Sequence, residues 1–106
     1  TLIFDEIDTG ISGRTAQKVS EKMALIARSH QVICITHLPQ IAAMADIHFL
    51  IEKNIKDGFT TTSINRLSDQ EIITELARML GGSQITDLVM DNAAQMKEFA
   101  DNLKKQ

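Results

Sequence analysis

The chain has 106 residues, which is enough for one domain with a modest hydrophobic core. Its 43% hydrophobic and 24% charged residues are ordinary for a globular protein, and no apolar run approaches the length of a membrane span. A formal charge of -3 argues against a domain whose whole surface clamps nucleic acid, and a single cysteine forms no internal disulfide. These features argue against a disulfide scaffold, a membrane protein and a disordered tail.

The N-terminal part is typical of a βαβ unit. An apolar run over residues 1–4 predicts a buried strand, apolar residues at helical spacing predict a helix from 12 or 13 to about 30, and residues 32–36 predict a second strand. Strands joined by a helix in this way are parallel. Because the first strand has no polar lead-in, we expect the C-terminal piece of a longer protein. A processed natural N-terminus is the alternative.

The middle of the chain predicts a short helix and a β-hairpin. Pro39 suits the first turn of a helix that runs through Ala45. Asp57-Gly58 is a strong two-residue turn signal between β-branched and aromatic flanks. Counting outward from this turn places Ile51 opposite Ile64 in an antiparallel ribbon.

Two helices are predicted at the C-terminal end. Ser68 and Glu71 form a capping box at the start of the first, and Gly81-Gly82 end it. The second begins at about Ile85 and ends near Lys104, where a positive charge suits the helix dipole. The apolar residues predicted to share one side of this last helix are Ile85, Leu88, Val89, Met96, Ala100 and Leu103.

Polar residues follow both predicted parallel strands. Because the carboxyl ends of parallel strands share one edge of a sheet, Asp5, Glu6 and His37 are expected close together, one or two strand spacings of about 4.8 Å apart. An acid at a strand tip can hold Mg²⁺, and the next carboxylate can polarise an attacking water. A histidine there can donate a hydrogen bond to a phosphate. The structural alternative is that these groups cap the following helices.

One stretch has only a superficial likeness to a phosphate loop. Residues 10–15 include two glycines, but Asp8 stands where a Walker A motif needs its first glycine, and Arg14 stands where it needs lysine. An acid at that position would repel the phosphates. The chain therefore contains no Walker A motif.

Three segments resemble the motifs of ABC-type ATPases. Leu2-Ile3-Phe4-Asp5-Glu6 is similar to a Walker B strand, residues 8–13 stand in the place of the D-loop, and Ile35-Thr36-His37 in that of the switch-histidine loop. Within that class, residues 4–13, 36–42 and 76–82 closely resemble the SMC-like ATPases of bacterial recombinational repair of DNA double-strand breaks. Transporter ATPases usually carry a proline after the glutamate and Leu-Asp in the D-loop, and this chain has neither.

The resemblance implies an α/β fold, a partial P-loop NTPase lobe of an ABC/SMC-type head with parallel strands, a β-hairpin and C-terminal helices. Residues 1–106 would form one C-terminal lobe of that head. The resemblance also implies that Asp5 binds Mg²⁺ and ATP, while Glu6 serves the hydrolytic water and His37 the γ-phosphate. The D-loop residues that it places at ATP and the partner head are Thr9, Gly10, Ile11 and Ser12.

The partners that the resemblance implies are the N-terminal lobe of the same head, a second head in an ATP-dependent dimer, and DNA through the full-length protein. A membrane is not among them, and the implied location is the cytoplasm, on the nucleoid. ATP and Mg²⁺ are the implied cofactors. Because Walker A, the signature loop and the coiled coil have no counterpart here, we expect no ATPase activity from the chain alone.

Two other functions fit parts of the pattern. Residues 5–8 also match the D-E-x-D box of helicases, but a helicase should follow that box with a strand ending in Ser/Thr-Ala-Thr, and this chain has Ile35-Thr36-His37. The other alternative is a non-catalytic interaction module whose last helices dock a partner.

Overall fold

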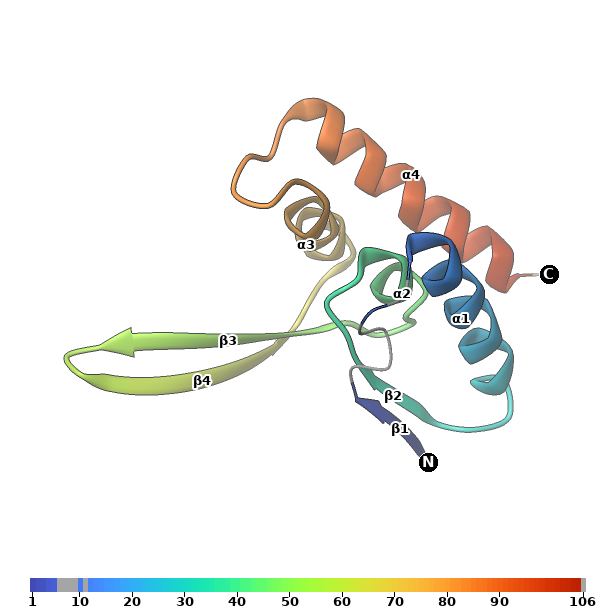
Figure 1. Ribbon diagram of the computed structural model, residues 1–106, viewed down its shortest axis with the longest axis horizontal. Helices are drawn as coiled ribbons and strands as arrows, with labels where there is room; N and C mark the ends of the chain where they lie inside the picture. Colours follow the sequence, from blue (N-terminus) through green and yellow to red (C-terminus); the bar gives the residue numbers. More distant parts are fainter. Residues whose placement is uncertain (6–9, 11, 106) are drawn as a thin grey trace.

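The computed structural model describes residues 1–5, 10 and 12–105, and Figure 1 traces them in chain order. The elements are β1 (Leu2–Asp5), α1 (Gly13–Ile26), β2 (Val32–Ile35), α2 (Pro39–Ala43), β3 (Phe49–Lys56), β4 (Phe59–Arg66), α3 (Asp69–Gly81) and α4 (Asp87–Lys104). Strands β1 and β2 form one two-stranded sheet, and β3 and β4 form another. The predicted α/β class, with parallel strands, a hairpin and C-terminal helices, is confirmed.

The βαβ unit forms as predicted, and β1 lies directly beside β2. The pair is parallel, with Phe4 opposite Cys34 and Asp5 opposite Ile35. Of the two spacings that the sequence left open, the shorter one holds. The intervening α1 ends at Ile26, and the residues after it, up to the predicted end at about residue 30, continue as hydrogen-bonded turns.

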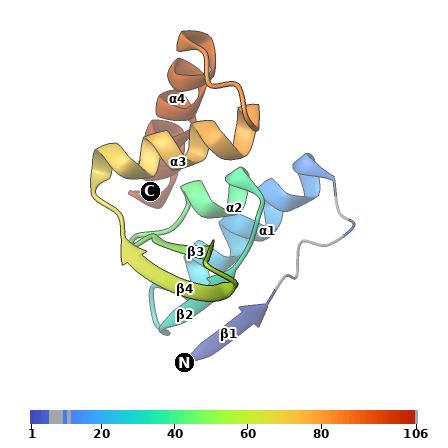
Figure 2. The same ribbon diagram turned by 90° about the vertical axis from the view of Figure 1, so that its left-hand side faces the viewer.

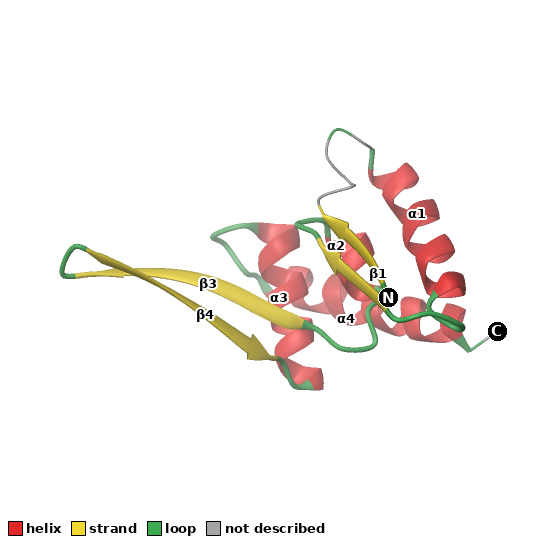
Figure 3. Ribbon diagram, turned by 90° about the horizontal axis from the view of Figure 1, so that it is seen from below, coloured by secondary structure: helices red, strands yellow, loops and turns green. Residues whose placement is uncertain are grey.

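The prediction that the first strand is buried is wrong for this structure. Side chains along a strand alternate between the two faces of a sheet, and only the face with Phe4 and Cys34 is partly covered. On the other face Ile3 is 68% exposed, and Ile33 and Ile35 are also exposed. No layer of the described chain covers that face. Figure 3 shows the two strands side by side, with α1 running alongside.

The hairpin forms with the predicted register. Ile51 pairs with Ile64, and Lys56 pairs with Phe59 across the turn. Both turn residues have positive φ, 50° at Asp57 and 79° at Gly58, as the two-residue hairpin turn requires. Figure 1 shows β3 and β4 extending away from the helices as a long ribbon.

The core lies where α2, α3 and α4 meet. Leu76 is its one large, completely buried apolar side chain among the described residues. Small side chains let the three helices approach closely, and the buried cluster consists of Ala42, Ala43, Met44, Ile72, Leu76, Ala77, Ala93 and Ala100. Figure 2 shows the layers: α3 and α4 above, α1 and α2 in the middle and the strands below.

The predicted capping box is present at the start of α3. Ser68 N donates to Glu71 Oε1 at 2.9 Å, and Glu71 N donates to Ser68 Oγ at 3.3 Å. The helix ends at Gly81, and Gly82 follows with a φ of 65°. The glycine pair therefore ends the helix as the sequence indicates.

Helix α4 begins two residues later than predicted. Thr86 caps it by accepting a hydrogen bond from Val89 N at 3.2 Å. Ile85 precedes the helix and Leu88 lies in its first turn, and both are exposed, so their predicted place on the packed side is wrong. The side that does pack includes residues at steps of three and four, together with Met90: Val89, Ala93, Met96, Ala100 and Leu103. No helix in the described ranges has the length and apolar content to cross a membrane.

Candidate functional site at the strand tips

The structure brings Asp5 and the His37 segment to the same edge of the sheet. Asp5 is the last residue of β1 and pairs with Ile35, the last residue of β2. Thr36 and His37 follow immediately, so the two strands end at the same level. Asp5 and His37 both have exposed side chains, so a ligand can reach both of them as far as the described residues are concerned. The expected meeting of these two sequence segments is confirmed.

The backbone around His37 is held by a local turn. Thr36 Oγ1 accepts a hydrogen bond from Leu38 N at 3.0 Å, the pattern of a turn that spans the residue between them. Leu38 is extended and precedes α2, in which Pro39 occupies the first turn. A side-chain turn on one side and a proline-started helix on the other therefore fix the direction in which the chain passes through His37.

Only part of the predicted D-loop lies within the described residues. Glu6, Thr9 and Ile11 lie outside them. Gly10 has a φ of 80°, in the left-handed region that favours glycine. Ser12 caps α1, since its Oγ accepts from Thr15 N at 3.3 Å. The predicted contacts of these residues with ATP or a partner head stay predictions.

Gln40 belongs to this region, and the sequence reasoning missed it. A Cβ atom at Gly13 would stand 3.0 Å from Gln40 Nε2, so the first residue of α1 lies against the second residue of α2. Gln40 Oε1 is buried and accepts no hydrogen bond within the described part of the chain. The glycine at the start of α1 was the available signal, because a missing side chain permits close approach.

The chemistry of the described edge is that of one carboxylate and one imidazole. Within the ranges 1–5, 10 and 12–105, no three His, Cys, Asp or Glu side chains gather as a metal-binding group. His48, directly before β3, is a titratable group outside this edge. Burial lowers the pKa of His48, the charge of Glu75 raises it and that of Lys97 lowers it, with a net decrease.

The chain is similar to known proteins along nearly all of its length. No protein-family model matches it. It is 50% identical over 104 residues to the DNA repair protein RecN of Bacillus subtilis (strain 168), which is 98% of this chain and 18% of that protein. It is 47% identical over 99 residues to the RecN of Haemophilus influenzae, 93% of this chain and again 18% of the relative. The RecN of Halalkalibacterium halodurans is 45% identical over 104 residues, again 98% of this chain and 18% of the relative.

The chain thus spans 18% of the length of these curated relatives. The motif segments that resemble SMC-like repair ATPases lie within a similarity that covers 98% of the chain. Over nearly its whole length, the chain therefore matches one segment of RecN proteins.

Proposed function

We propose that this chain is part of the ATPase head of a RecN-type protein that acts in recombinational repair of DNA double-strand breaks. In this function it supplies the Walker B strand, the D-loop and the switch histidine for ATP hydrolysis. The observation that carries the proposal is the pairing of Asp5 with Ile35, which ends both strands at one level and puts Asp5 and His37 on one open edge. The identity to RecN proteins supports it.

The donor groups at this edge fit ATP and Mg²⁺. Mg²⁺ keeps several of its waters and takes one or two carboxylates, and Asp5 offers an exposed carboxylate at a strand tip. When bound, Mg²⁺ neutralises charge on the phosphates. In this arrangement Asp5 would hold the ion directly or through water, Glu6 would orient and polarise the attacking water, and His37 would donate a hydrogen bond to the γ-phosphate.

The rest of the family's longer chain is the first proposed partner. Two apolar faces are uncovered in the described part of this chain, one on each two-stranded sheet. Their apolar residues are Ile3, Ile33 and Ile35 on the parallel pair, and Phe49, Ile51, Ile55 and Ile64 on the hairpin, whose face also carries Lys53 and Arg66. Two-stranded sheets are marginally stable alone, and contiguous apolar patches mark interaction sites. We assign these faces to the N-terminal lobe of the same head.

The other proposed partners act at or beyond the strand tips. A second head would contact residues 9–12 in an ATP-dependent dimer, and DNA would be bound through the full-length protein. We place this activity in the cytoplasm, on the nucleoid. The helicase alternative is not favoured, because the relatives that match nearly the whole chain carry the name of the DNA repair protein RecN.

The test is Glu6→Gln in the full-length protein. This substitution keeps the shape and hydrogen bonding of the side chain but removes the base, so ATP binding should survive while turnover falls ~10²-fold or more. The variant should accumulate as an ATP-bound dimer of heads. Glu52→Gln, at an exposed position of β3, is the matched control and should keep normal turnover. Normal turnover in Glu6→Gln would refute the assignment of Glu6.

A further inference from the structure

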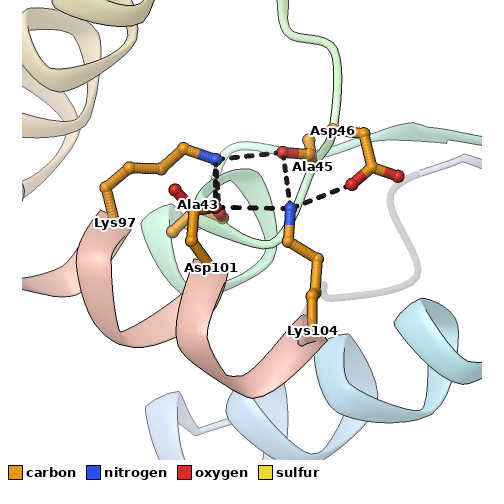
Figure 4. Close-up of polar contacts among 6 residues, drawn as sticks. All are labelled: Ala43, Ala45, Asp46, Lys97, Asp101 and Lys104. Carbon is orange, nitrogen blue, oxygen red and sulfur yellow. Dashed lines mark hydrogen bonds and ion pairs between the residues drawn. The ribbon is translucent and has the colours of Figure 1, made fainter. Parts of the chain in front are cut away.

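Two lysines of α4 hold the C-terminal end of α2, and we call them the lysine clamp: Lys97 and Lys104 (Figure 4). Lys97 Nζ donates to the carbonyl oxygens of Ala43 at 3.2 Å and Ala45 at 3.1 Å. Lys104 Nζ donates to the same oxygen of Ala45 at 3.2 Å and to Asp46 Oδ1 at 3.0 Å. The clamp thus joins parts of the chain more than 50 residues apart in sequence.

Asp101 completes the cluster from within α4. Its Oδ1 lies 3.0 Å from Lys97 Nζ and 3.5 Å from Lys104 Nζ. The two lysine side chains are only 15% and 19% exposed, whereas surface lysines usually keep their ammonium groups in water. Burial would raise the pKa of Asp101, but hydrogen bonds and charge from both lysines outweigh it, so the pKa is lowered. The geometry is that of an ordered, partly buried network.

The lysine clamp binds a helix that is too short to be stable without contacts to the rest of the protein. Helix α2 has five residues, and so short a helix depends on packing because its nucleation is costly. The last carbonyls of any helix lack partners within it, and positive charge at that end is favourable. Lys97 satisfies the carbonyl of Ala43, the last residue of α2, and both lysines bind the chain just beyond it. Through these bonds α4 holds the C-terminal end of α2, while α1 and α3 pack against the rest of the helix.

The start of the same short helix is tied to His37. Leu38 O accepts hydrogen bonds from Ile41 N at 3.2 Å and Ala42 N at 3.1 Å, so Leu38 is part of the first turn. Leu38 N in turn donates to Thr36 Oγ1 across His37. His37 is therefore linked to α2 by short hydrogen-bonded turns, so a shift of α2 should also shift the backbone of His37.

We propose that the lysine clamp positions His37, so that α4 holds the switch-histidine segment in the place where it contacts the γ-phosphate. This inference rests on the proposed function, in which His37 meets bound ATP. Lys97 and Lys104 are positioning residues in this scheme, since they touch the carbonyl end of α2 and not the reacting atoms.

The experiment measures ATPase kcat and KM of the full-length protein for wild type, Lys97→Met, His37→Ala and the double variant. Misplacing a catalytic group by a change far from the chemistry is costly, so Lys97→Met should lower kcat about 10-fold. KM for ATP should stay within about twofold, because most of the binding energy comes from other contacts. Lys105→Met, at an exposed residue directly after α4, is the matched control and should turn over normally.

The double variant tests whether Lys97 acts through His37. If Lys97 acts through His37, Lys97→Met should have no further effect on kcat in a protein that already carries His37→Ala. A fold-loss in that background equal to the loss in wild type would show a general structural effect and overturn the inference. Normal kcat in Lys97→Met would overturn it as well. Should Lys97→Met not fold, Asp101→Asn, which loosens both lysines, takes its place with the same readouts.

The proposed function can fail separately. Wild-type turnover in His37→Ala would remove the histidine from the site, and the inference with it. A slow His37→Ala protein beside a normal Lys97→Met protein would retain the function and refute only the role of the clamp.

Discussion

The side-chain amide of Gln40 lies against Gly13, so closely that a Cβ atom at residue 13 would stand 3.0 Å from its nitrogen. This contact joins the start of α1 to the start of α2. The first helix follows the segment that carries Asp5, and the second follows His37 by two residues. The helices that follow the two halves of the proposed site are thus in contact at their first turns.

A double-mutant cycle tests this contact. Alanine at residue 13 gains helix propensity but pushes on the Gln40 amide, whereas alanine at residue 40 removes the obstacle. Gly13→Ala should therefore be more favourable in a Gln40→Ala protein than in wild type, with a coupling free energy of about 0.5–1 kcal/mol. Denaturant unfolding of the four proteins measures it. Equal effects of Gly13→Ala in both backgrounds would contradict the contact.

His37→Ala in the full-length protein separates the functional from the structural role of this histidine. As a γ-phosphate sensor, His37 bonds a group that ATP has and ADP lacks. Its removal should slow hydrolysis and weaken discrimination between the two nucleotides, with little change in melting because the side chain is exposed. ATPase rate, ATP and ADP affinities and a thermal melt on one preparation give the answer. If His37 has only a structural role, His37→Ala should instead destabilise the protein by ~1 kcal/mol or more. This would appear as a lower melting temperature with an unchanged ATPase rate.

The lowered pKa of His48 predicts a stability that depends on pH. Burial is the main cause of the decrease from the ordinary value of 6.5, and Nδ1 is buried without a hydrogen-bond partner in the described part of the chain. When the protein unfolds between the folded and unfolded pKa values, His48 takes up a proton. Stability should therefore be complete above the unfolded pKa and fall as the pH drops through about 6.5 toward the folded value.

Thermal melts of the full-length protein and of His48→Gln at about pH 7.5 and about pH 5.5 measure this contribution. The wild type should lose more stability than the variant on acidification, since glutamine does not titrate. If the melting temperatures of wild type and His48→Gln differ by the same amount at both pH values, His48 has no part in the pH dependence of stability.

The uncovered face of the hairpin gives a test of the proposed N-terminal partner. Ile55 is 79% exposed in this structure, and Asn54 beside it is exposed on the opposite face of the ribbon. If the rest of the protein covers the apolar face, Ile55→Lys should destabilise the full-length protein by about 2 kcal/mol or more, because it buries a charge. Asn54→Lys should have little effect. Calorimetric melts that leave both variants at the wild-type temperature would refute the assignment of this face.

Local chemistry explains the parts of the fold that the sequence predicts well. The Asp57-Gly58 turn sets the pairing of Ile51 with Ile64, because a two-residue turn fixes the register of both strands. The capping box at Ser68 and Glu71 likewise involves groups three residues apart. The parallel pairing of two strands joined by a helix likewise puts the ends of β1 and β2 on the same edge of the sheet.

Contacts between distant segments explain the rest. The exposure of Ile3 depends on whether another layer covers its face, which hydrophobic patterning within one strand does not reveal. The bonds of Lys97 to the end of α2 join residues 52 and 54 apart, and as a sequence pattern that lysine reads as a solvated charge on a helix. The meeting of Gln40 with Gly13 depends on how two helices cross, which follows from their packing.

The hairpin also bears on how molecules of this kind associate. In the described part of the chain β3 and β4 pair only with each other, so the outer edge of each strand presents backbone N–H and C=O groups without a third strand. Such edges are templates for strand pairing between molecules, and an apolar face beside them strengthens the association. The chain on its own is thus predisposed to edge-to-edge aggregation through this ribbon. The charged residues of β3 oppose this association, because in a like-aligned neighbour each would face its own copy: Glu52, Lys53 and Lys56.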